Sequence, residues 1–308
     1  MNLTISSSGV SVQDLTKLRK TNVKVPATCG ELMQGFLDDR DFLINCPMNR
    51  FAHFQIGLSE GQGVYLRSSE NLTKVKDAVS KALDRLAYGD KAAYIDPLEL
   101  IPRGKGLASS TAEITAVVAA TSYLLSGSYW HQDLCTRILM EIDKSTDAVY
   151  CEGITMCDHL AGQVFMQFRR VPSLSFVIVD AGSEVDTAFF DRAKARRNAL
   201  NHEDRLRSAL ASMIYGLQHN KPSFVAKAAT ESALINQHIL EKPCLTELIS
   251  GTKEWGSLGV NCAHTGSVLG VLFDPLQCNS DQLLERVCTL VGKDKVIGRY
   301  DLISGGLY

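Results

Sequence analysis

The stretch of this sequence best suited to chemistry is a glycine loop that runs into a pair of serines. It reads Pro102-Arg103-Gly104-Lys105-Gly106-Leu107-Ala108-Ser109-Ser110. The two glycines lack Cβ atoms, so several backbone N–H groups can turn towards one anion. The Ala/Val-rich segment that follows is typical of a buried helix, whose positive N-terminus would face the same anion. These features predict a phosphate-binding loop, although a glycine turn before a core helix is the plainer interpretation of a lone Gly-x-Gly.

Two further blocks combine glycine with reactive side chains. The first, Cys29-Gly30-Glu31, follows a short predicted strand at 23–26 that we expect to end at Pro26. The second, at 261–273, places His264-Thr265-Gly266-Ser267 before an apolar strand. Taken alone, each block is more typical of a structural turn than of an active site.

Together, the three blocks resemble the GHMP kinase family, whose phosphate loop reads Pro-x-x-x-Gly-Leu-Gly/Ser/Ala-Ser-Ser-x. Six residues fall on that pattern in order: Pro102, Gly106, Leu107, Ala108, Ser109 and Ser110. The resemblance implies an α+β fold of two domains, of which the second is ferredoxin-like and folds a glycine loop back against the phosphate loop. We therefore expect an extension over 1–22, an ATP-binding domain over 23–170 and a C-terminal domain over 171–308.

Within the family, the sequence is similar to the branch that holds the L-threonine kinases of cobalamin biosynthesis and propanediol utilisation. The similar runs are Pro26–Leu32, 179–187, Ala263–Gly270 and Ser304–Gly306. The resemblance implies ATP-dependent phosphorylation of L-threonine to L-threonine O-3-phosphate, a precursor of the cobamide linker. The alternatives are another hydroxy amino acid such as L-serine or homoserine, a different small alcohol, or a nucleotide-binding regulator without catalysis.

The resemblance also implies roles for individual residues. Backbone N–H groups of the loop would hold the phosphates of ATP, with the cofactor-binding set Pro102, Gly104, Lys105, Gly106, Leu107, Ala108, Ser109 and Ser110. The Ser110 hydroxyl would bind Mg²⁺, and Lys105 would either add positive charge or remain solvated. Asp147 occupies the place of the family's active-site aspartate, where it would accept the proton of the alcohol or orient and polarise the hydroxyl.

The residues before Asp147 depart from the branch. Its members usually read Glu-Pro-Ser-Asp, whereas this chain reads Lys144-Ser145-Thr146-Asp147. Lys144 therefore places an ammonium group where the branch has a carboxylate that would assist the metal or the substrate. This change weakens the assignment of L-threonine as substrate more than the assignment of the reaction as phosphoryl transfer. Glu141 or Asp143 would have to replace that carboxylate as a metal ligand.

An amino-acid substrate requires partners for its ammonium and carboxylate groups. Glu31 is the candidate for the ammonium, and backbone N–H groups of Thr265–Ser267 are candidates for the carboxylate. The predicted substrate-binding set is Cys29, Gly30, Glu31, His264, Thr265, Gly266 and Ser267. His159 and His264 are either hydrogen-bonded structural histidines or substrate contacts.

Composition excludes several other classes of protein. The 308 residues carry a net charge of −2, which gives no basic footprint for nucleic acid or an anionic membrane. Nine dispersed cysteines without a Cys-x-x-Cys pair predict free thiols, and no apolar run approaches a membrane span. We expect a cytoplasmic enzyme, with a homodimer as an option. The basic run at 192–197 is either a solvated face or a rim that attracts an anionic substrate.

Overall fold

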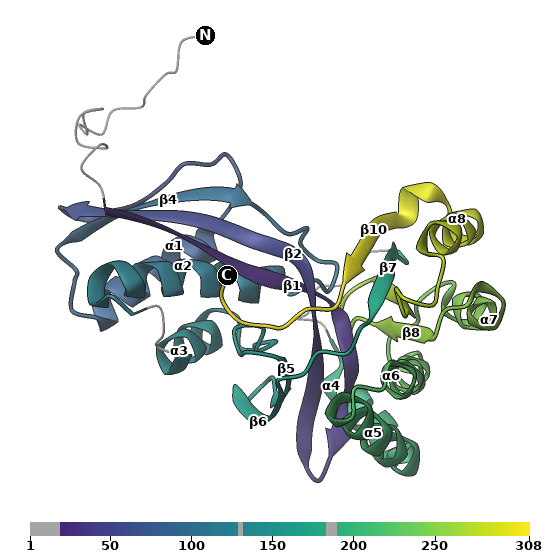
Figure 1. Cartoon of the computed structure of the whole chain (residues 1–308). Helices are drawn as coiled ribbons and strands as arrows, with labels where there is room; N and C mark the ends of the chain where they lie inside the picture. Colours follow the sequence, from purple (N-terminus) through teal and green to yellow (C-terminus); the bar gives the residue numbers. More distant parts are fainter. Residues whose placement is uncertain (1–18, 129–131, 183–189) are drawn as a thin grey trace.

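The computed structural model describes residues 19–128, 132–182 and 190–308 (Figure 1). Residues 1–18 of the predicted extension therefore lie outside the described residues, as do residues 183–187 of the run similar to the L-threonine kinases. Within the described ranges the fold is α+β, as expected, and no helix is both long and apolar enough to span a bilayer. All nine cysteines are described and have free thiols.

One sheet runs through the described part of the chain. Its order is β10(Val296–Asp301), β7(Ser175–Asp180), β9(Val268–Phe273), β8(Gly259–Cys262), β1(Arg19–Leu37), β2(Arg40–Glu60), β4(Lys91–Glu99) and β3(Gly63–Leu66). β5(Ile154–Asp158) pairs with the first residues of β2, at Leu43 and Ile44, and β6(Gln163–Phe168) pairs with β5. The neighbours are antiparallel except for β3 and β4. The long strands β1 and β2 thus connect the two halves of the molecule (Figure 1).

The prediction that the first strand ends at Pro26 is wrong. β1 continues to Leu37 because it shifts register at Pro26/Ala27, between Thr28 and Glu31, and between Glu31 and Met33. Such bulges accommodate a residue that has no N–H and re-aim the side chains beside them. The Cys29-Gly30-Glu31 block therefore lies within the central strand, where Glu31 pairs with Cys262 of β8.

Helices cover the sheet in two groups (Figure 1). The first group is α1(Thr73–Arg85), α2(Ser109–Ser126) and α3(Gln132–Ile142). The second is α4(Arg192–Asn201), α5(Glu203–Gln218), α6(Pro222–Asn236), α7(Leu245–Trp255) and α8(Ser280–Val291), followed by the 3₁₀ turn Lys293–Lys295. Helix α2 is buried over most of its length because it is apolar nearly all round, as the Ala/Val-rich sequence predicts.

The C-terminal residues return to the first half of the molecule. Tyr308 exchanges two backbone hydrogen bonds with Lys24, and Gly305 N–H donates to the Gly153 carbonyl at 2.8 Å. A large apolar core lies under β1, β2 and α2, and a smaller one lies between β7–β9 and the helices α7 and α8. The proposed domain boundary at residues 170/171 falls between β6 and β7 and remains a prediction.

Candidate active site

The glycine loop leads into the N-terminus of α2 with an unusual backbone. Gly104, Gly106 and Ala108 have φ angles of +72°, +84° and +54°, and α2 begins at Ser109. Because the N-cap is Ala108, no side chain caps the first turn of the helix. The Ser110 hydroxyl oxygen is buried and has no hydrogen-bond partner. An uncapped helix N-terminus with a free buried hydroxyl fits an anionic group and its counter-ion.

The three glycine blocks meet at this loop. Gly30 N–H donates to the Gly106 carbonyl at 3.1 Å, and Ser267 N–H donates to the Lys105 carbonyl at 3.0 Å. A Cβ atom on Gly266 would lie 2.2 Å from the Lys105 carbonyl oxygen, so only glycine allows this approach. The expectation that the third block folds against the phosphate loop is confirmed. The Ser267 N–H is thereby occupied, which leaves it no hydrogen to give to a substrate carboxylate.

Lys105 is neither solvated nor free for phosphate. Its ammonium group lies 3.0 Å from a carboxylate oxygen of Asp180, at the end of β7. Asp180 also accepts the Ser267 hydroxyl at 2.6 Å. Burial alone would raise the pKa of Asp180, but these two partners hold it below its ordinary value. The ion pair fastens the phosphate loop to the second half of the molecule.

Asp147 lies beside the first turn of α2. Its carboxylate accepts the Thr111 hydroxyl at 3.3 Å, and its backbone carbonyl accepts the Asn45 side-chain amide at 3.1 Å. Burial raises the pKa of Asp147 to about 6, against the lowering effect of the Thr111 hydrogen bond. The carboxylate is therefore ionised at neutral pH while remaining basic enough to accept a proton.

Glu31 is close enough to Asp147 for their charges to interact. Burial, followed by the negative charge of Asp147, raises the pKa of Glu31 to about 8, so this carboxyl is largely protonated at neutral pH. One of its oxygens accepts the backbone N–H of His264. In the free protein Glu31 thus holds the third glycine block in place, and its predicted role towards a substrate ammonium remains a prediction.

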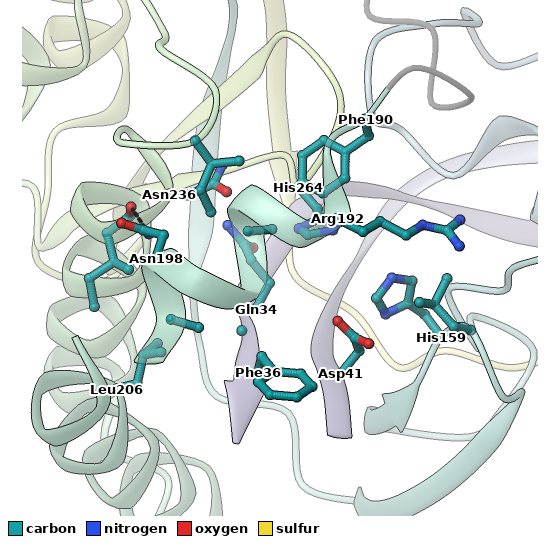
Figure 2. Close-up of a pocket in the computed structure, with 16 residues that line it drawn as sticks. Gln34, Phe36, Asp41, His159, Phe190, Arg192, Asn198, Leu206, Asn236 and His264 are labelled. Carbon is teal, nitrogen blue, oxygen red and sulfur yellow. Dashed lines mark hydrogen bonds between the residues drawn. The ribbon is translucent and has the colours of Figure 1, made fainter. Parts of the chain in front are cut away.

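A pocket opens next to His264, between β1, α4 and the end of α6 (Figure 2). The rings of His159 and His264 are 5.3 Å apart, and Phe190 lies 4.7 Å from His264. Burial lowers the pKa of both histidines, so both are neutral at physiological pH. Four of the residues that line the pocket each carry a buried polar atom without a partner among the described residues: Gln34 Oε1, His159 Nδ1, Asn236 Oδ1 and His264 Nδ1. These unpartnered atoms favour substrate contact over a purely structural role for the two histidines.

Comparisons with known proteins agree with this geometry, although a scan against protein-family models finds no match. L-threonine kinases of Citrobacter freundii and Salmonella typhimurium are each 27% identical to this chain, over 81% and 83% of its length and 85% of theirs. A homoserine kinase from Cytophaga hutchinsonii superposes with a TM-score of 0.71 at 15% identity, covering 94% of this chain and 96% of that one. MDDEF in complex with MVAPP, AMPPCP and magnesium gives a TM-score of 0.61 at 13% identity, covering 94% of this chain and 99% of that one.

These relatives and solved structures support a member of the GHMP kinase family. The solved structures support the fold, and the relatives named as kinases support a phosphotransferase, as the sequence predicted. The same geometry also bears on the residue at which this chain departs from the L-threonine kinase branch that it resembles. Lys144 is exposed, has a φ of +60°, and donates to the Glu141 carbonyl at 2.9 Å. Its ammonium therefore caps the C-terminus of α3 and does not place a positive charge beside Asp147.

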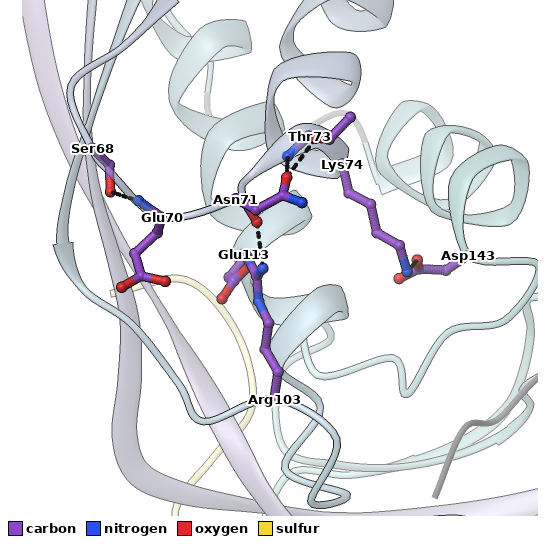
Figure 3. Close-up of polar contacts among 8 residues, drawn as sticks. All are labelled: Ser68, Glu70, Asn71, Thr73, Lys74, Arg103, Glu113 and Asp143. Carbon is purple, nitrogen blue, oxygen red and sulfur yellow. Dashed lines mark hydrogen bonds and ion pairs between the residues drawn. The ribbon is translucent and has the colours of Figure 1, made fainter. Parts of the chain in front are cut away.

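The two carboxylates predicted as alternative metal ligands are engaged elsewhere. Glu141 is paired with Lys81 and Arg85 in the last turns of α1. The phosphate loop contacts the opposite end of α1, because Arg103 donates a hydrogen bond to the Asn71 carbonyl at 2.6 Å. Glu141 is therefore remote from the phosphate loop. Asp143 is closer, but it forms an ion pair of 2.6 Å with Lys74 (Figure 3).

A carboxylate that the sequence analysis missed lies nearer to Ser110. Glu113 is one helical turn further along α2 and only 2% exposed. One of its oxygens pairs with Arg103 at 2.6 Å, while the other, Oε1, is buried without a partner (Figure 3). The available signal was a single charged residue within an otherwise apolar helix. Within the described ranges, no three His, Cys, Asp or Glu side chains form a metal-binding group.

Proposed function

We propose that this GHMP kinase transfers the γ-phosphoryl group of ATP to the side-chain hydroxyl of an amino acid, with L-threonine as the first choice. The observation that carries the proposal is the position of Asp147, hydrogen-bonded to the first turn of the phosphate-loop helix. The L-threonine kinases that cover more than four fifths of this chain support the choice of substrate. The product would be L-threonine O-3-phosphate, which would supply cobamide linker synthesis.

The nucleotide would bind at the uncapped end of α2. Backbone N–H groups of the loop from Gly104 to Ser109 would hold the β- and γ-phosphates. Ser110 Oγ and Glu113 Oε1 are both buried and unpartnered, which fits a Mg²⁺ ion bound together with the phosphates. The ion would neutralise phosphate charge when bound. MDDEF, which has the same fold, was solved with AMPPCP and magnesium.

Asp147 would act on the alcohol. Its carboxylate, with a pKa of about 6, can accept the hydroxyl proton or orient and polarise the hydroxyl for in-line attack. The neighbouring Glu31 carboxyl is protonated at neutral pH and therefore does not repel the incoming phosphates. Placement of the hydroxyl between Asp147 and the loop would supply most of the acceleration.

The pocket beside His264 would hold the rest of the amino acid. The unpartnered carbonyl oxygens of Gln34 and Asn236 can accept hydrogen bonds from an ammonium group. Because His159 and His264 are neutral, they would not repel the positive charge of the ammonium group. Arg192 places an exposed guanidinium at the rim (Figure 2), which suits the second of the two interpretations of the basic run at 192–197.

A coupled assay of ADP release with Mg-ATP tests the proposal, with L-threonine, L-serine and homoserine compared at equal concentration. We expect L-threonine to stimulate release most and phosphorus NMR to show a new phosphomonoester. Stimulation by L-serine or homoserine alone would change the substrate but keep the reaction. Tight ATP binding without turnover on any alcohol would overturn the proposal in favour of a regulator, which the exposed position of Lys144 no longer favours.

A further inference from the structure

A buried lysine lies behind the pocket, in the turn between α6 and α7. Lys242 is only 3% exposed, and its ammonium nitrogen is buried without a hydrogen-bond partner. Its backbone is fixed by the Gln237 side chain, which accepts Lys242 N–H at 2.9 Å and donates to the Lys242 carbonyl at 3.1 Å. An unpaired charge in a protein interior is strongly unfavourable, so such a group requires an anion to complete it.

Among the described residues, the groups around Lys242 do not provide that anion. Its charge acts on His264, which lines the pocket, and on Glu31 and Cys262, which lie behind it. Glu31 is largely protonated at neutral pH, and burial raises the pKa of the Cys262 thiol, so neither carries a compensating negative charge. The Cys262 sulfur instead accepts the amide groups of Gln34, at 3.4 Å, and Asn236, at 3.6 Å.

We infer that the Lys242 ammonium pairs with the carboxylate of the substrate, so that the enzyme selects hydroxy acids over alcohols that lack a carboxylate. The inference rests on the proposed function and identifies a partner that the sequence analysis assigned to backbone N–H groups at Thr265–Ser267. A buried ammonium–carboxylate contact is charge-assisted and poorly screened, whereas Arg192 at the exposed rim is screened by water. The unpartnered oxygens of Gln34 and Asn236 would then receive the α-ammonium group of the same molecule.

The test compares L-threonine with L-threoninamide, which keeps the hydroxyl and the ammonium but loses the carboxylate charge. Both compounds are assayed for kcat/KM with the wild type, with Lys242→Met and with the control Lys227→Met, an exposed lysine on α6. We expect the wild type and the control to prefer L-threonine. Lys242→Met should lose about 10- to 100-fold in kcat/KM for L-threonine and change little for L-threoninamide.

Thermal unfolding of the same variants gives a readout that does not depend on turnover. Because Lys242→Met removes an unpaired charge, the Tm of the free protein should stay the same or rise, and the upward shift caused by L-threonine should disappear. Equal losses with both compounds would assign Lys242 a structural role and overturn the inference. If Lys242→Met does not fold, equal use of both compounds by the wild type would overturn it instead. Failure of the wild type on every hydroxy amino acid would overturn the proposed function itself.

Discussion

The Thr111 hydroxyl donates to the Asp147 carboxylate across 3.3 Å, joining the first turn of the phosphate-loop helix to the aspartate that precedes β5. Residues 36 positions apart in the sequence are thereby held where phosphate and alcohol would meet. The hydrogen bond stabilises the ionised carboxylate, the form that can accept a proton. Two predictions depend on this contact.

Replacement of the aspartate itself should abolish most of the activity. Asp147→Asn keeps the size of the side chain and its hydrogen bond to Thr111 but cannot accept a proton. We expect kcat to fall by about 100-fold or more, with the Tm close to that of the wild type. Asp38→Asn, at an exposed turn, is the matched control. Activity of Asp147→Asn near that of the control would contradict the role of Asp147.

The pH profile should report the same carboxyl group. Because the pKa of Asp147 is raised to about 6, kcat/KM should rise with pH through about 6 as the carboxylate forms. Thr111→Val removes a hydrogen bond that lowers this pKa, so the rising limb should move to higher pH. Thr115→Val is the control, because the Thr115 hydroxyl contacts Cys135 and not Asp147. Identical profiles for Thr111→Val and the wild type would rule out Asp147 as the titrating group.

The phosphate loop and most helices could be predicted because their signals are local. Gly104, Gly106 and the serines form a contiguous pattern, and the apolar run after them predicts a buried helix. The continuation of β1 past Pro26 could not be predicted, since bulges depend on the neighbouring strand. Pairing of the third block with the loop became predictable only through the resemblance to the GHMP kinases.

Several properties of the site depend on contacts that no local pattern contains. Lys144 is exposed and its ammonium donates to the Glu141 carbonyl, so its charge does not conflict with Asp147 as the sequence suggested. The free oxygen of Glu113 and the unpaired ammonium of Lys242 emerge only from the partners that surround them. Glu113 and Lys242 differ from surface charges in their burial and in the polar atom that each leaves without a hydrogen-bond partner, neither of which the residue type reveals.

Stability should depend on pH through Glu31. Its pKa is about 8 in the folded protein and close to 4.5 when unfolded, so between these values the folded state binds the extra proton. Folding is therefore most favoured below this window, and the free energy of unfolding should decrease as the pH rises through it. Glu31→Gln cannot titrate, and its Tm should decline less between pH 5 and 8. Glu70→Gln, on an exposed loop, should follow the wild type, and a parallel decline in Glu31→Gln would contradict the prediction.

The metal requirement should identify which carboxylate lies beside the phosphates. Glu113 Oε1 and Ser110 Oγ are buried and unpartnered on the same face of α2, whereas Glu141 is paired at the far end of α1. Glu113→Gln keeps a carbonyl oxygen for Arg103 but loses the negative charge that a divalent cation prefers. Titration of Mn²⁺ with ATP, followed by electron paramagnetic resonance, should show binding weakened by about 10-fold or more in Glu113→Gln, and also weakened in Ser110→Ala. Glu141→Gln should bind as the wild type does, because its carboxylate faces Lys81 and Arg85. Weaker binding in Glu141→Gln together with unchanged binding in Glu113→Gln would instead require α3 to approach the phosphate loop when the nucleotide binds.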